Sequence, residues 1–354
     1  GQAERAVMEQ AAATVERALT AAPISHPCFA GLVAAVDDGG PEISAARPFV
    51  PAEASPLEPL LVRILVDALG DRPADQVPAM RTDFPGAVPA GDRAAVEVEI
   101  DGDAPGLSAA YASAQADRPE WRSTGLYAPP GEVITVEAPV VGALSVQIGA
   151  HPDTLWHRDT WRRYPQIVTA VALSAPRVEL ASGFGGPVYI RVPPMSALGP
   201  LRLRITGAVP MARYDLANPD DWPAEREKPA PWAELVGARV TLTVPAADAA
   251  VADPAALLAR WDALLEASAT LAGEPRARVE RLTLDRQSST RNGRAHGGYP
   301  MVAPILPLAA LTADDEVLNA LGANHLWVDW VFAGNAAALP RLWSVYLAEE
   351  VLGQ

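Results

Sequence analysis

The spacing of apolar residues changes part-way along the chain, and no other feature restricts the fold as strongly. Between residues 96 and 244, short runs alternate apolar and polar side chains, and glycine or proline separates one run from the next. Such alternation is typical of strands with one buried face. From residue 254 onwards, apolar side chains recur at the spacing of one helical face. The sequence therefore predicts an α+β fold with a strand-rich segment ahead of a mainly helical one.

We expect three units along the chain. Residues 1–90 predict an N-terminal helical module that ends in a proline-rich linker. Residues 91–248 predict a β-sandwich-like subdomain, and residues 240–244 are its last expected strand. Residues 249–354 predict a mainly helical subdomain. The expected helices span residues 3–21, 56–70, 254–268, 314–328 and 338–352.

The charge balance of the chain restricts which classes of molecule it can bind. The chain has 28 basic and 43 acidic residues, which gives a net charge of -15. A nucleic-acid-binding protein needs a clustered positive surface to displace counterions from phosphates, and docking on anionic lipid needs the same sign of charge. No stretch approaches the roughly 20 apolar residues of a membrane helix. We therefore expect no nucleic-acid partner and no membrane insertion.

The histidines and the cysteine offer little metal chemistry. The single cysteine, Cys28, excludes an intrachain disulfide and a thiolate zinc cluster. His151, Asp153 and His157 form an H-x-D-x-x-x-H string that could contribute metal ligands. The alternative is a loop whose polar side chains are hydrogen-bonded within the protein, and the two tryptophans close to the string favour it. The sequence contains no H-E-x-x-H, G-x-S-x-G, Walker or dinucleotide-binding motif.

Nine motifs in a fixed order carry a resemblance to a known family. They are STGLYAPPGE at 123–132, GAHPDTLW at 149–156, WRRYP at 161–165, FGGPVYI at 184–190, PWAEL at 231–235, TVP at 243–245, ER at 280–281, DRQ at 285–287 and GYPM at 298–301. Residues 120–352 thereby resemble the enhancin-like, mucin-degrading zinc metallopeptidases. The resemblance implies a β-sandwich that leads into a gluzincin-type subdomain, and a mucin-type O-glycoprotein as ligand. It also implies a bacterial protein that is secreted, periplasmic or on the cell surface.

The active-site helix departs from the family pattern. In the family this helix carries H-E-x-G-H-N-x-Q, and a glutamate follows downstream; here residues 319–326 read NALGANHL. Asn319 and Ala323 replace the two histidine ligands, Ala320 replaces the general base, and Ala337 replaces the glutamate ligand. Catalytic zinc needs three protein ligands and an open position for water. The resemblance therefore implies a protein without catalytic residues, metal or cofactor, in which the family's zinc is lost.

Four other residues match the part of the family's groove that binds glycan and peptide. They are Tyr299, Asn324, Asp329 and Trp330, and we consider them candidates for binding a glycoprotein or O-glycan. Each has a structural alternative. Tyr299 could shape the turn before Pro300, Asn324 could hydrogen-bond at the helix end, Asp329 could be a solvated or capping carboxylate, and Trp330 could belong to the core.

We consider three functions. The first is a catalytically inactive pseudopeptidase that binds a glycoprotein, a glycan or a protein partner. The second is a structural or assembly subunit: the family's domain normally continues beyond this point, so we expect a truncated subdomain whose apolar residues 342–347 need a partner chain or a second copy. The third is a metallopeptidase with rearranged ligands such as His296, His325 and a carboxylate. The sequence leaves open whether the inactivation is natural or deliberate.

Overall fold

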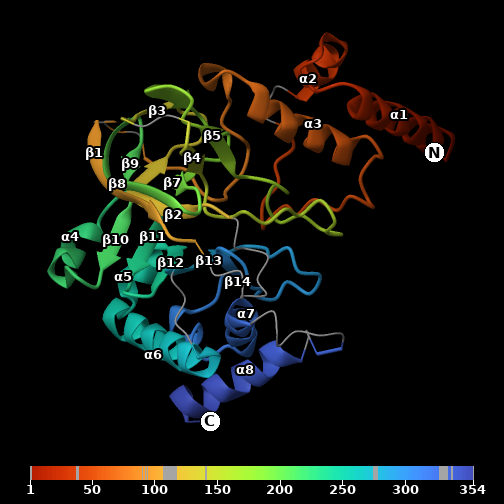
Figure 1. Ribbon diagram of the computed structural model, residues 1–354. Helices are drawn as coiled ribbons and strands as arrows, with labels where there is room; N and C mark the ends of the chain where they lie inside the picture. Colours follow the sequence, from red (N-terminus) through yellow and green to blue (C-terminus); the bar gives the residue numbers. More distant parts are fainter. Residues whose placement is uncertain are drawn as a thin grey trace.

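The computed structural model describes residues 2–36, 40–89, 91, 93, 95–106, 118–139, 142–273, 278–326, 334–335 and 338–353. Three β-sheets form the centre of the molecule (Figure 1). Helices α1 (Gln2–Ala21), α2 (Ala30–Val36) and α3 (Glu58–Asp71) lie at one end, and α6 (Pro254–Ala272), α7 (Asp315–His325) and α8 (Leu339–Leu347) lie at the other. This arrangement confirms the predicted α+β class.

Short helical elements complete the helical part. Helix α4 (Trp222–Glu225) precedes strands β11 (Trp232–Val236) and β12 (Val240–Pro245), and α5 (Ala246–Val251) follows them. A π-helical turn, Ala348–Leu352, extends α8. Single 3₁₀ turns cover Pro27–Phe29, Ala74–Gln76, Pro219–Asp221 and Leu308–Ala310. Among the described helices, none is both long enough and apolar enough to cross a membrane.

The local sequence explains where α6 begins and ends. The side chain of Asp253 accepts a hydrogen bond from the backbone N–H of Ala256, and Pro254 occupies the first helical turn. At the other end, Gly273 adopts a φ of +86°, a conformation that favours glycine. Helix α6 contacts β11 and β12, and α7 contacts β14 (Met301–Pro304).

Two sheets form the expected β-sandwich. One contains, in spatial order, β1 (Val96–Ala104), β8 (Ser196–Thr206), β3 (Ile134–Glu137) and β6 (Arg177–Leu180). The other contains β5 (Thr169–Ala172), β4 (Ser145–Ile148), β7 (Gly186–Val192), β2 (Glu120–Ala128) and β9 (Val209–Pro210). Alternate residues of both sheets, such as Val98 and Ile190, share one buried apolar cluster, which is what the alternating sequence predicts.

The third sheet corrects one assignment. It contains β10 (Ala212–Asp215), β11 (Trp232–Val236), β12 (Val240–Pro245), β13 (Glu280–Asp285) and β14 (Met301–Pro304). We expected residues 240–244 to be the last strand of the sandwich, but β12 lies in the middle of this mixed sheet, parallel to β13. The alternation was misleading because Thr241 and Thr243 are buried rather than solvated. The domain boundaries at 90 and 248 stay predictions.

The proline-rich stretch that we expected to be a linker is held against the rest of the protein. Phe84 lies edge-on to Trp232, with ring centroids 5.7 Å apart. The indole of Trp232 donates a hydrogen bond to the carbonyl of Pro85 at 2.8 Å, and the Tyr127 hydroxyl donates to the carbonyl of Gly86 at 2.6 Å. Buried aromatic side chains from both subdomains thus fix this segment, which proline content alone did not reveal.

Helix α8 buries part of the apolar face that we expected to be open. Of the apolar residues between 342 and 347, Trp343 is 3% exposed and Leu347 is fully buried. The Trp343 indole donates to the hydroxyl of Ser268 on α6 at 3.3 Å. Only Leu342 and Val345 stay exposed, at 65% and 61%. Trp343 and Leu347 are therefore covered within the chain itself, and a partner for the exposed Leu342 and Val345 stays a prediction.

Candidate functional site

Helix α7 holds the positions at which the sequence departs from the family motif. Its first turn is capped by Asp314, whose carboxylate accepts hydrogen bonds from the backbone N–H groups of Glu316 and Val317. The helix ends at His325, where the backbone turns extended, one turn earlier than expected. Gly322 lies against α8: an added Cβ would approach Trp343 Cβ to 2.7 Å, so this close approach of the two helices requires glycine.

A loop backbone lies on the face of α7 that carries Ala320 and Ala323. A Cβ added to Gly297 would lie 2.8 Å from Asn324 Oδ1, 3.1 Å from the Ala320 carbonyl oxygen and 3.3 Å from Ala323 Cβ. The small side chain of Ala323 leaves room for this backbone. The loop therefore occupies space beside the positions that would carry the general base and the second histidine in the family pattern.

The residues at these positions do not fit a catalytic zinc ion. Zinc is bound by thiolate, imidazole or carboxylate groups, and the alanines offer no donor atom. Asn319 offers only a neutral amide, and its buried Oδ1 accepts no hydrogen bond within the described chain. No group of three His, Cys, Asp or Glu side chains that could hold a metal occurs among the described residues. Ala337 lies outside the described residues.

The two histidines of the rearranged-ligand hypothesis are held in separate contacts. His325 is buried, and its Nδ1 lies 2.9 Å from the carbonyl oxygen of Leu321. His296 Nε2 lies 2.9 Å and 3.1 Å from the two carboxylate oxygens of Asp153, and its Nδ1 lies 2.8 Å from the Gly297 carbonyl. Because both nitrogens of His296 face acceptors, this arrangement suits the doubly protonated ring.

Two of the four groove candidates have contacts of their own. The Asn324 amide accepts from the Gly298 N–H at 2.8 Å and donates to the Gly298 carbonyl at 2.9 Å, so it fixes the turn ahead of Tyr299. The Tyr299 hydroxyl accepts from the Trp121 N–H at 3.3 Å, and the Arg278 guanidinium lies 3.8 Å from the centre of its ring. These contacts favour the structural alternatives, and ligand binding stays a prediction for both. Asp329 and Trp330 lie outside the described residues.

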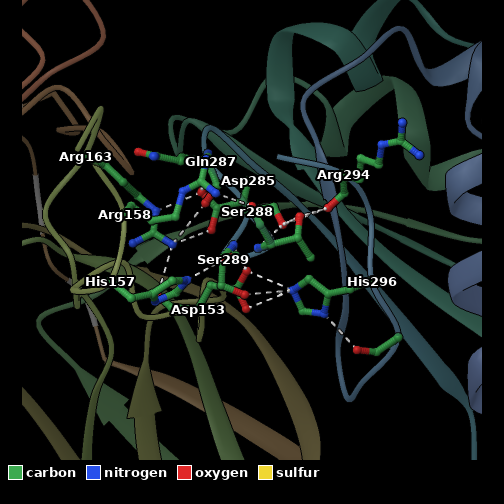
Figure 2. Close-up of polar contacts among 12 residues, drawn as sticks. Asp153, His157, Arg158, Arg163, Asp285, Gln287, Ser288, Ser289, Arg294 and His296 are labelled. Carbon is green, nitrogen blue, oxygen red and sulfur yellow. Dashed lines mark hydrogen bonds and ion pairs between the residues drawn. The ribbon is translucent and has the colours of Figure 1, made fainter. Parts of the chain in front are cut away.

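A polar network joins two loops that contain several of the motifs (Figure 2). Residues 149–168 follow β4 in the sandwich, and residues 286–300 connect β13 to β14 in the third sheet. The Arg163 guanidinium donates two hydrogen bonds to Asp285, and neither side chain is exposed. The Gln287 amide accepts from the Arg162 N–H and donates to the Thr160 carbonyl, each at 2.7 Å. The WRRYP and DRQ motifs therefore form an interface between subdomains.

The H-x-D-x-x-x-H string is divided among three environments. His151 is buried between Phe84 and Trp232, and burial lowers its pKa to about 4. Asp153 accepts from His296 and from the Ser289 N–H at 2.6 Å, whereas His157 Nε2 lies 2.7 Å from the Ser289 carbonyl. Asp153 and His157 thus follow the alternative that we considered, internally hydrogen-bonded side chains, whereas His151 packs between two aromatic rings.

The charges in this network perturb both partners of the Asp153–His296 pair. Burial opposes ionisation of His296, but the hydrogen bond and the charge of Asp153 outweigh burial and raise the pKa of the imidazole. Burial likewise raises the pKa of Asp153, and the hydrogen bond and charge of His296 more than reverse that effect, so the pKa of the carboxyl is lowered. The pair is therefore held as an ion pair.

Ser289 completes a group that resembles a catalytic triad only in composition. Its Oγ lies 3.3 Å from His296 Nε2, the nitrogen that also faces Asp153. In a triad the hydroxyl and the carboxylate occupy different nitrogens of the ring, so that the imidazole can accept the hydroxyl proton. Here His296 has no free lone pair directed at Ser289. Sequence reasoning missed this group because 143 residues separate Asp153 from His296.

Two family models match consecutive parts of the chain. Residues 92–206 match the N-terminal domain of M60-like peptidases, and residues 207–330 match peptidase M60, enhancin and enhancin-like. The junction between the two models coincides with the end of β8 in the sandwich.

Curated relatives come from vertebrates. The TRPM8 channel-associated factor homolog of Xenopus laevis is 35% identical over 276 residues, which are 73% of this chain and 29% of that protein. TRPM8 channel-associated factor 1 of Homo sapiens is 33% identical over 251 residues, which are 66% of this chain and 27% of that protein. The chain thus spans less than a third of the length of these relatives.

Solved structures share the fold at low sequence identity. The IMPa metallopeptidase from Pseudomonas aeruginosa has a TM-score of 0.53 at 13% identity, over 91% of this chain and 44% of that one. The M60 catalytic domain of Clostridium perfringens ZmpC, in complex with the sialyl T antigen, has a TM-score of 0.52 at 15% identity, over 72% and 57% of the two chains. This likeness shows a common architecture.

Proposed function

The chain belongs to the M60-like peptidase family, and we propose that it is a member without peptidase activity that acts by binding a protein partner. The proposal rests on one observation, the side chains of α7. Asn319 and Ala323 stand at the two histidine positions and Ala320 at the position of the base, and the Gly297 backbone lies against both alanines. Without a bound metal no water is acidified, and without a base no side chain takes its proton.

A protein partner is favoured over a free glycan. The curated relatives are named for association with a channel, and the shared region makes a protein partner the class that we propose for this chain. The glycan-binding candidates give less support, because Asn324 and Tyr299 are 2% and 3% exposed and already hold internal contacts. The predicted extracellular location and bacterial origin stay predictions, and the curated relatives are eukaryotic.

Metal content and turnover test the inactive state. The protein is loaded with zinc, dialysed and measured by plasma mass spectrometry, and it is then incubated with a mucin-type O-glycopeptide. We expect far less than one zinc per chain and no cleavage, with an active M60 metallopeptidase treated in parallel as the positive control. One zinc per chain together with turnover would overturn the proposal.

Partner binding is tested separately. Cross-linking in the source organism identifies candidate proteins, which are then purified and titrated against the full chain. We expect a saturable one-to-one complex and no signal on a glycan array. Glycan binding without a protein complex would establish the glycan-binding alternative, and stable self-association without either would establish the assembly subunit.

A further inference from the structure

The loop that connects β13 to β14 contains a reactive pair of residues, Asn292 followed by Gly293. The chain has five asparagines, and the other four precede proline, alanine or histidine. The backbone nitrogen that follows an asparagine can attack the side-chain amide, and glycine hinders this attack least because it has no side chain. Asn292 is therefore the asparagine of this chain at which the attack is most favourable.

The structure leaves this pair open to solvent. Asn292 is exposed, and a Cβ added to Gly293 would meet no atom within 4 Å. One contact opposes the attack, because the Gly293 N–H donates to the Thr290 carbonyl at 2.8 Å and closes a turn. This hydrogen bond must open first. A single exposed turn outside the helices and strands opens far more readily than the core does.

Both sides of the turn are tied to the polar network between the two subdomains (Figure 2). The Thr290 carbonyl also accepts from the Arg158 guanidinium of the loop after β4. On the other side, the Arg294 carbonyl accepts from the hydroxyls of Ser288 and Thr290, each at 2.8 Å. The length of backbone between Thr290 and Arg294 is therefore matched to these contacts, and a change in that length would act on the interface.

We propose that Asn292 is a site of spontaneous deamidation, and that its isoaspartyl product loosens the contact between the two loops. The Gly293 nitrogen gives its proton to a base in solution and bonds to Cγ of Asn292. The bond from Cγ to the side-chain nitrogen breaks, and that nitrogen takes up a proton and leaves as ammonia. Water then opens the cyclic imide at either carbonyl, which gives aspartate or isoaspartate. The reaction consumes water alone and needs no oxidant or reductant.

The two products should act differently on the interface. Each adds a negative charge, which Arg291 and Arg294 on either side of the pair tolerate. In isoaspartate the backbone runs through the side chain and gains a methylene group, so the anchored carbonyls of Thr290 and Arg294 no longer fit their donors. We expect the Arg158 contact to weaken in this form only. The site is independent of the proposed function, because the reaction requires neither a metal nor a partner.

Mass spectrometry of the full chain tests the reaction. After incubation in mildly alkaline buffer, a gain of about 1 Da should appear at Asn292 and should form faster at higher pH, since an amide is replaced by a carboxylate. Protein isoaspartyl methyltransferase should label the isoaspartyl fraction. Asn292→Gln closes a larger ring less readily, and we expect its rate to be at least about tenfold lower. Asn218 is the internal control, because Pro219 has no N–H and the mass there should not change.

A synthetic peptide of residues 286–298 gives the rate for an unfolded chain. If the folded protein kept the Asn292 amide while this peptide lost most of its own, the turn would be protective and the modification site would be overturned. A similar gain in the Asn292→Gln variant would also overturn it.

Urea unfolding tests the effect on the interface. The isoaspartyl form, enriched by anion exchange, should unfold at a lower urea concentration than the Asn292→Asp variant, which carries the same charge on an unchanged backbone. Equal unfolding midpoints would overturn the loosening of the two loops. None of these outcomes depends on zinc content or glycopeptide cleavage, so the site and the proposed function stand or fall separately.

Discussion

Arg163 and Asp285 form a bidentate ion pair that is completely buried. Arg163 Nε lies 2.8 Å from Oδ1 and a terminal nitrogen lies 2.7 Å from Oδ2, and both side chains are 0% exposed. The pair joins the loop after β4 to the end of β13, across 122 residues of sequence. The planar guanidinium matches the carboxylate in a way that lysine does not, so the pair fixes both the distance and the orientation of the two subdomains.

Removal of one partner should therefore destabilise the protein strongly. Asp285→Asn leaves the Arg163 charge buried without compensation, and we expect a loss of about 3–5 kcal/mol in the free energy of unfolding. Urea denaturation measures this loss. The double variant Arg163→Met, Asp285→Leu should recover much of it, because no buried charge remains.

An exposed ion pair provides the matched control. Arg202 and Glu99 lie 3.0 Å apart on the outer face of the sandwich, with side chains 81% and 59% exposed. Glu99→Gln should change stability by about 0–1 kcal/mol, since water screens this pair. A loss of similar size in Asp285→Asn and Glu99→Gln would contradict the role assigned to the buried pair.

The contact between Gly297 and α7 gives a second prediction. Gly297→Ala would place a methyl group 2.8 Å from Asn324 Oδ1 and 3.1 Å from the Ala320 carbonyl, and we expect a loss of about 1–3 kcal/mol. Thermal unfolding measures the effect. Gly70→Ala near the end of α3, where no atom lies within 4 Å of the added methyl, should be neutral or stabilising. Equal melting temperatures for the two variants would argue against this contact.

Stability should fall in alkaline solution because of His296. Its pKa is raised in the folded state, so its contribution is complete below about 6.5, the usual value, and is lost as the pH rises through the folded pKa. Urea unfolding between pH 6 and pH 9 should show this loss. His296→Gln should abolish that slope, whereas replacement of the exposed His26 should leave it in place.

His151 should act in a different range and with the opposite sign. Its pKa of about 4 means that the unfolded chain takes up a proton before the folded one does, so stability falls as the pH drops from 6.5 to 4. The loss should reach roughly 3 kcal/mol at the lower limit. His151→Phe retains an aromatic ring between Phe84 and Trp232 without the titration, and its unfolding free energy should depend less on pH in this range. If His151→Phe left the pH dependence of the unfolding free energy unchanged, other titrating groups would account for it.

Local sequence patterns predicted the local structure. The apolar spacing over residues 254–268 predicts a helix, and α6 spans Pro254–Ala272 because Asp253 and Gly273 provide the two caps. The alternating run at residues 188–192 likewise corresponds to β7. The pattern over residues 240–244 was correct about the strand but not about its sheet. Alternation shows which side chains share a face, but it does not show what covers each face.

Contacts between distant segments were beyond the reach of these patterns. The resemblance located the positions on α7, and their chemistry could be judged from the residue types alone. The position of the loop at Gly297 could not be predicted from the sequence. The requirement for glycine there comes from Ala320, Ala323 and Asn324 on another segment.

The interface centred on Arg163 and Asp285 also bears on how such proteins are recognised. The motifs that reveal the resemblance include WRRYP and DRQ, and three of their side chains, Arg163, Asp285 and Gln287, hold the two loops together. A chain can keep them for mechanical reasons, since they hold two subdomains in register, while the residues on α7 change freely. One set of residues thus reveals the ancestry of the chain, and another set determines its chemistry. Only the active-site positions on α7 should be considered when an enzymatic activity is assigned.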